Sequence, residues 1–106
     1  MVVRVLYAIA IMGVVLFPVL ALPDTPVTVG ITDYAYIPQK ITIKRGQSVT
    51  WTNNDESPHT VTANGNEFRS PPLDTKDTFV QVFDKPGSYP YYCVLHPHMT
   101  GVVEVE

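Results

Sequence analysis

The sequence contains little cysteine, little histidine and little positive charge. Its 106 residues include one cysteine and three histidines, and seven basic residues stand against ten acidic ones. A lone cysteine cannot form a disulfide within a secreted chain, so the thiol needs another explanation. Because there is no basic cluster, we do not expect nucleic acid as a partner. No Ser-His-Asp or paired-carboxylate arrangement is evident either, and we do not expect an enzyme.

The first 22 residues differ in character from the rest of the chain. A short start containing Arg4 precedes an uncharged, almost unbroken apolar run from Val5 to Leu22. Val19-Leu20-Ala21 has the modest residue sizes that a signal peptidase reads, so we expect a signal peptide over residues 1–21. The run of 18 residues is also near the lower limit for a membrane-spanning helix, which leaves a retained N-terminal anchor open. Both interpretations place the domain, residues 24–106, outside the cytoplasm, in the periplasm or on the outer face of the cytoplasmic membrane.

After residue 23 the sequence has no segment with helical periodicity. Apolar residues instead alternate with polar ones between turn residues such as Asp84-Lys85-Pro86-Gly87. Strand-like segments cover residues 27–31, 41–43, 49–52, 59–62, 78–83, 88–93 and 101–106. About seven to eight short strands without a helix predict an all-β fold, a β-sandwich. The tyrosines at 34, 36, 89 and 91 are expected to be core or strand-pairing aromatics.

The densest group of reactive side chains lies in residues 91–101, Tyr-Tyr-Cys-Val-Leu-His-Pro-His-Met-Thr-Gly. A thiol (Cys93), two imidazoles (His96 and His98) and a thioether (Met99) fall within seven residues there. The remaining histidine, His59, opens a strand-like segment far upstream. Thiolate and thioether favour Cu(I) and imidazole serves either oxidation state, so this set suits a copper ion that cycles between the two.

These residues resemble the ligand pattern of the cupredoxins. Cys93-x-x-His96-x-x-Met99 is similar to their ligand loop, with the two-residue second gap of amicyanin, and Pro58-His59 looks like the upstream histidine. The resemblance extends over residues 27–106. It implies a Greek-key β-sandwich and one copper ion in a blue site held by His59, Cys93, His96 and Met99. It also implies that the protein shuttles single electrons between larger redox proteins.

Two positions depart from the family pattern. Many cupredoxins have asparagine directly after the upstream histidine, where its side chain braces the cysteine loop, but this chain has Thr60. Groups behind the ligands orient them and tune the metal, so Thr60 bears on the reduction potential. Amicyanin tends to have phenylalanine before the axial methionine, where this chain has His98. We expect His98 to lie outside the ligand set.

Three other functions compete with that of an electron carrier. Multicopper oxidases relay electrons through histidines on both sides of the ligand cysteine, whereas the neighbours here are Tyr92 and Val94, and binuclear electron-entry sites need two cysteines. A copper-binding or copper-delivery module without a redox circuit could use the same ligands and stays open. So does a structural zinc site, whose candidate ligands are Cys93, His59, His96 and His98.

A docking surface is expected around the edge of His96. Pro58, Leu95 and Pro97 would form an apolar rim, with His98 beside it. We expect transient contacts with redox partner proteins there and a monomeric domain. Contact with a membrane is expected only through an uncleaved N-terminal anchor.

Overall fold

The computed structural model describes residue 13 and residues 25–106, and the domain begins its first strand at Val27. The leader predicted over residues 1–21 lies outside the described residues, apart from Gly13, so its cleavage or retention stays a prediction. In the part of the chain that is described, no helix has the length and apolar character needed to cross a membrane.

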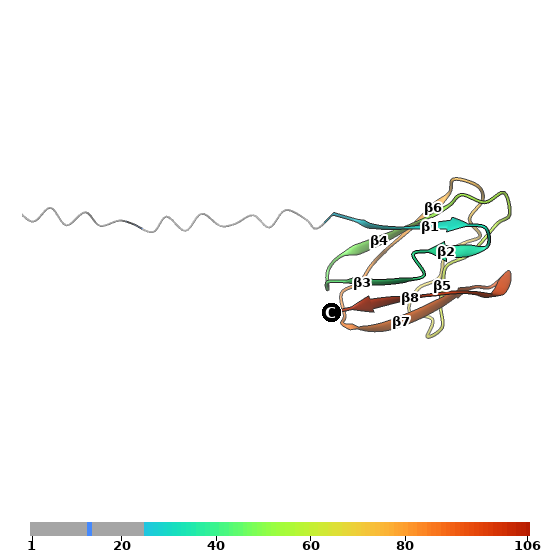
Figure 1. Ribbon diagram of the computed structural model, residues 1–106. Coiled ribbons are helices and arrows are strands. Elements are labelled where there is room, and N and C mark those ends of the chain that lie inside the picture. The colour runs from blue at the N-terminus through green and yellow to red at the C-terminus, as the bar shows by residue number, and fades with distance from the viewer. Residues whose placement is uncertain (1–12, 14–24) are drawn as a thin grey trace, which may run out of the picture.

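The domain is a sandwich of two four-stranded sheets (Figure 1). One sheet has the order β2-β1-β4-β6 and the other β3-β8-β7-β5. The strands are β1 (Val27–Thr32), β2 (Ala35–Ile37), β3 (Lys40–Ile43), β4 (Ser48–Asn53), β5 (Thr62–Ala63), β6 (Thr78–Val82), β7 (Gly87–Cys93) and β8 (His96–Val105). β1 and β4 are parallel, as are β3 and β8, and the other pairs are antiparallel. The predicted all-β sandwich fold is confirmed.

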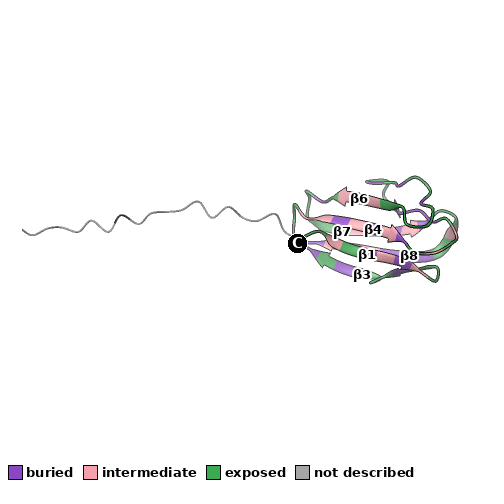
Figure 2. Cartoon of the chain, turned by 90° about the horizontal axis from the view of Figure 1, so that it is seen from above, coloured by how far each residue is buried: buried purple, intermediate pink, exposed green. Residues whose placement is uncertain are grey.

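The core forms because successive side chains of a strand point to opposite faces of its sheet. Buried and more exposed residues alternate along β1, β4 and β8 (Figure 2). Trp51 of β4 is fully buried, and its ring lies 5.4 Å from that of Tyr91 and 5.9 Å from those of Phe68 and Phe79. These aromatic contacts pack the two sheets against each other.

Three elements differ from the sequence-based expectation. β2 was not predicted as a strand, and it pairs only with β1 at the edge of its sheet. The predicted strand over residues 59–62 is reduced to β5, Thr62–Ala63, with a single bridge between His59 and Leu73 before it. β8 begins at His96 rather than at Gly101, so the stretch expected as a loop is the start of a strand paired with β7.

Several strand ends meet at one end of the sandwich. β1 and β4 are parallel, so the β1–β2 turn and the loop after β4 lie at the same end. The hairpin between β7 and β8 lies at that end too (Figure 1). The fold thereby brings Cys93 at the end of β7 and His96 at the start of β8 to the region of the chain that follows β4.

Candidate metal centre

Three potential metal ligands converge at this end of the sandwich. One ligand atom each from His59, Cys93 and His96 lie within 4.8 Å of one another. Cys93 Sγ is 3.8 Å from His59 Nδ1 and 3.6 Å from His96 Nδ1. His59 and Cys93 are fully buried, whereas His96 is half-buried. The predicted meeting of residue 59 with the 93–99 segment is therefore observed.

The spacing of these atoms fits a single ion. A sulfur and a nitrogen that bind one metal at about 2.3 and 2.0 Å, about 120° apart, would be about 3.7 Å from each other. The two observed S···N separations are 3.6 and 3.8 Å. A thiolate with two imidazoles in a trigonal arrangement is the donor set of blue-copper sites.

Cys93 is held by the backbone around it as well as by its strand. The pairing of β7 with β8 has an irregularity between Tyr92 and Cys93, which brings Cys93 opposite His96. The backbone N–H of Thr60 donates a hydrogen bond to Cys93 Sγ over 3.3 Å. This hydrogen bond helps to fix the position of the sulfur.

Thr60 also braces the cysteine loop through its side chain. Its Oγ1 accepts a hydrogen bond from the backbone N–H of Val94, the residue after the cysteine, over 2.9 Å. The side chain is buried, and its Oγ1 lies 3.3 Å from that of Thr62. The bracing contact that the family's asparagine provides therefore has a counterpart here, made by a shorter side chain.

His59 is fixed from both its backbone and its ring. Its backbone exchanges two hydrogen bonds with Leu73, of 3.1 and 2.7 Å. Its Nε2 lies 2.8 Å from Asp55 Oδ2, which leaves Nδ1 on the side of Cys93. Burial by itself would raise the pKa of Asp55, but the backbone N–H groups of Tyr34 and Asp33 and the His59 ring outweigh it and lower that pKa below its ordinary value.

Tyr34 stands against both histidine rings. Its ring is perpendicular to each of them, with centroids 5.1 Å from His59 and 4.8 Å from His96. Tyr34 is 54% exposed and lies in a turn, so it is a surface residue of the site and not the core or strand-pairing aromatic expected from the sequence. Tyr36 and Tyr91, by contrast, are buried as expected, and their rings pack 4.6 Å apart.

Met99 and His98 take different places on β8. Met99 is 5% exposed, packs in the core cluster and is positioned with His59, Cys93 and His96 as in a type 1 copper site. His98 is exposed and does not belong to the group whose ligand atoms converge in the described part of the chain. The zinc alternative with His98 as fourth ligand therefore lacks the convergence that it needs.

The comparison with known proteins agrees with this geometry. Residues 5–105 match the family model described as a cupredoxin-like domain. The chain belongs to the cupredoxin family. It is 35% identical over 89 residues to amicyanin from Paracoccus versutus. The aligned region covers 79% of this chain and 67% of that protein.

Solved structures show the same likeness. A purple cupredoxin from Nitrosopumilus maritimus superposes with a TM-score of 0.71 and 38% identity, covering 76% of this cupredoxin and 99% of that chain. A Cu-containing nitrite reductase from Thermus scotoductus gives a TM-score of 0.74 and 28% identity, but only 23% of that enzyme is covered, against 80% of this chain. The donor set and the family together make one copper ion the cofactor.

The predicted docking residues all lie at the surface. Pro58, Leu95, Pro97 and His98 are exposed, Leu95 at 47%. Two residues that touch the histidines, Asp55 and Tyr34, were not predicted from the sequence. Neither residue belongs to a recognisable sequence motif. The spacing of four residues between Asp55 and His59 is the only sequence signal for Asp55, and acidic residues at that spacing are common in loops.

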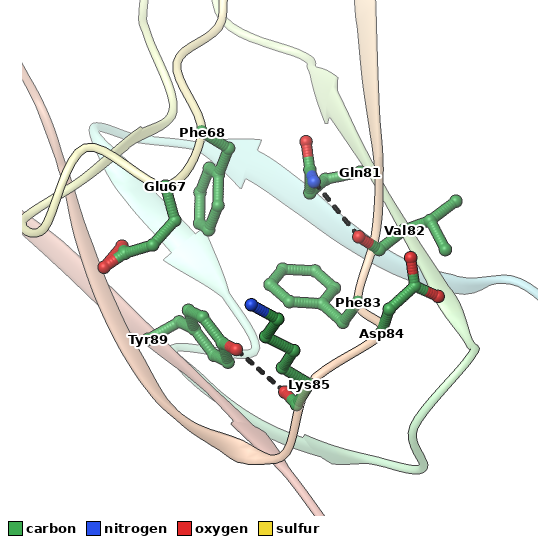
Figure 3. A pocket seen from close by; sticks show the side chains of 8 residues that line it. All are labelled: Glu67, Phe68, Gln81, Val82, Phe83, Asp84, Lys85 and Tyr89. Carbon is green, nitrogen blue, oxygen red and sulfur yellow. Dashed lines mark hydrogen bonds between the residues drawn. The ribbon is translucent and has the colours of Figure 1, made fainter.

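The opposite end of the sandwich has a hollow of a different kind. β6 runs antiparallel to β4, so its end and the start of β7 lie away from Cys93. A hollow of about 270 Å³ opens there, with the Lys85 side chain beside the rings of Phe83 and Tyr89 (Figure 3). Its lining contains no cysteine or histidine, so it offers no second site for a soft metal.

Proposed function

We propose that this cupredoxin is a blue-copper electron carrier in which His59, Cys93, His96 and Met99 would hold the copper ion. The observation that carries the proposal is the S···N separations of 3.8 and 3.6 Å around one buried thiol. Copper bound there would supply the chemistry, the uptake and release of one electron at a time.

The chain's own residues keep the ligands in place for this task. Thr60 holds Cys93 Sγ and the Val94 amide from one side, and Asp55 holds His59 from the other. Ligands fixed by hydrogen bonds to a β-scaffold move little, and little movement between oxidation states means a low barrier to electron transfer.

Electrons would enter and leave at His96, the half-buried member of a set whose other members are buried. The exposed Pro58, Leu95, Pro97 and His98 form the candidate docking surface. Transient electron-transfer encounters typically bury a small area, and we expect brief contacts of this kind with redox partner proteins there. We propose that the domain acts as a monomer.

The proposed location is outside the cytoplasm. Its support is the uncharged apolar run of residues 5–22 after Arg4, which reads as a signal peptide or an anchor. Fractionation of cells that produce the full chain, with N-terminal sequencing of the product, tests both parts. A cytoplasmic product would contradict the proposal.

We further propose that the domain is not itself an enzyme. The likeness to the nitrite reductase extends over 23% of that protein, so it concerns a shared domain and not the whole enzyme. Copper delivery to another protein uses the same ligands and is the alternative. Rapid loss of copper to a copper-free acceptor, without reversible voltammetry, would favour delivery over electron transfer.

The test of the copper site compares the copper-loaded protein with Cys93→Ser. The wild type should show the intense visible absorption of a Cu(II)–thiolate bond, a reversible reduction potential and fast self-exchange. Serine lacks the sulfur, so the variant should lose the colour while keeping the fold. A colourless wild type, or a variant that stays blue, would refute the proposed site.

A further inference from the structure

Asp55 makes more contacts around the histidines than a loop carboxylate needs for its own turn. Its Oδ2 lies 2.8 Å from His59 Nε2 and accepts the backbone N–H of Tyr34 over 2.9 Å. Its Oδ1 accepts the backbone N–H of Asp33 over 2.8 Å. One carboxylate therefore joins a metal-site histidine to the turn between β1 and β2.

Asp55 is itself held in position by a buried residue. The Asp55 backbone N–H donates to Asn53 Oδ1 over 2.9 Å, and Asn53 is fully buried. The Asn53 side-chain amide donates in turn to the carbonyls of Leu73 and Ser57 over 2.8 and 3.0 Å. Asn53 therefore connects Asp55 to Leu73, the residue whose backbone is hydrogen-bonded to that of His59.

The turn that Asp55 holds has an unfavourable sequence for its shape. Thr32 pairs with Ala35, so Asp33 and Tyr34 form a two-residue hairpin loop, with φ angles of 52° and 58°. A loop with two left-handed residues normally has Asn-Gly or a similar pair, because other side chains are strained there. The two N–H groups bound by Asp55 offset that strain and leave the Tyr34 ring against both histidines.

We propose that Asp55 is a positioning residue of the copper site: it fixes the ring of His59 with Nδ1 toward Cys93 and, through the β1–β2 turn, seats Tyr34 over His59 and His96. The inference rests on the proposed copper site. A neutral imidazole donates through one nitrogen and accepts through the other, so a carboxylate at Nε2 leaves the lone pair on Nδ1. The same negative partner makes the ring a stronger donor to the metal.

The experiment compares the full-length wild type with Asp55→Asn and with Asp77→Asn as a matched control. Asp77 is also a loop carboxylate that accepts a backbone N–H, that of Asp74, over 2.9 Å, but it does not touch a histidine. Three readouts are the ¹⁵N shifts of the His59 ring in the copper-free and Cu(I) proteins, copper affinity by chelator competition, and the reduction potential at neutral pH.

We expect the copper-free wild type to carry its His59 proton on Nε2. Asp55→Asn should weaken copper binding by about 10- to 100-fold, the usual effect of removing a partner of a ligand. It should also raise the reduction potential, because loss of the negative charge destabilises Cu(II) more than Cu(I). Asp77→Asn should change neither quantity.

Two results would overturn the inference. One is a copper-free wild type with the His59 proton on Nδ1, which needs no variant and so does not depend on how Asp55→Asn folds. The other is an Asp55→Asn protein whose affinity and potential equal those of Asp77→Asn. A wild type that binds copper without blue colour would instead refute the proposed function, while the ring tautomer would still report on Asp55.

Discussion

Replacing Thr60 by valine tests how the cysteine loop is braced. Valine has nearly the shape of threonine but no hydroxyl, so Thr60→Val removes the acceptor of the Val94 N–H and the partner of the Thr62 hydroxyl. The backbone N–H of residue 60, which donates to Cys93 Sγ, is left in place. The substitution therefore separates the side-chain brace from the hydrogen bond to sulfur.

The expected cost follows from the groups left without a partner. Leaving a buried donor unsatisfied costs about 1–3 kcal/mol, and because Val94 is exposed, at 44%, we expect the lower part of that range, about 1–2 kcal/mol. In a domain of this size that is a fall in Tm of about 4–16 °C. Thr60→Ser is the matched control: it keeps the hydroxyl and loses one buried methyl group, worth about 0.8 kcal/mol.

The deciding assay is amide hydrogen exchange at Val94, measured alongside urea unfolding. Thr60→Val should speed exchange of that amide far more than exchange of the β8 amides, whereas Thr60→Ser should leave it protected. The visible spectrum of the copper form should shift in the valine variant only, because Val94 follows the ligand cysteine. Equal protection of Val94 in both variants would refute the idea that Thr60 braces the loop.

Three further outcomes are expected. Gly101→Ala should lower the free energy of unfolding in urea by about 1–3 kcal/mol, because the added Cβ would lie 2.4 Å from the buried Tyr91 ring. Gly30→Ala is the control and should stay close to wild type, because its Cβ would have no neighbour nearer than 3.6 Å. Equal unfolding midpoints of the two variants would contradict this prediction. Copper at about a thousand times its Kd should stabilise the protein by about 4 kcal/mol in thermal melts, and Cys93→Ser should lose that gain. Tyr34→Ala should speed copper loss to a chelator by about fivefold, since it removes ring contacts worth about 1 kcal/mol, and an unchanged rate would show that the ring does not cover the site.

Local patterns made the fold class and the convergence of three ligands predictable. Alternation such as that of Val29 and Ile31 with polar neighbours reflects one buried face of each strand, and that face is visible in any short window. Cys93 and His96 are near each other in any hairpin of this length. His59 was predicted because it opens a strand-like segment behind Pro58, upstream of the ligand-rich loop, and because Pro58-His59 resembles the upstream histidine of the cupredoxins.

Asp55 and Tyr34, which support the histidines, could not be predicted because their contacts join segments that are far apart in the sequence. Asp55 acts on Asp33 and Tyr34 across 22 and 21 residues, and nothing in either segment marks the other. Tyr34 resembles an ordinary strand aromatic until its left-handed φ of 58° turns it outward. β2 was missed because it is three residues long and depends on that turn.

The two sides of the metal centre are built with unequal stiffness. Cys93 and His96 sit on β7 and β8, which pair along most of their length, and β8 is also paired with β3. His59 lies outside the strands and is held by two backbone hydrogen bonds to Leu73 and by one contact of its ring with Asp55. A metal site is only as rigid as its least constrained ligand. The Asp55 contact therefore has to fix the His59 ring, as the β7–β8 hairpin fixes Cys93 and His96. This asymmetry is why we expect a loop carboxylate, remote in sequence from the cysteine hairpin, to influence the copper affinity and the reduction potential.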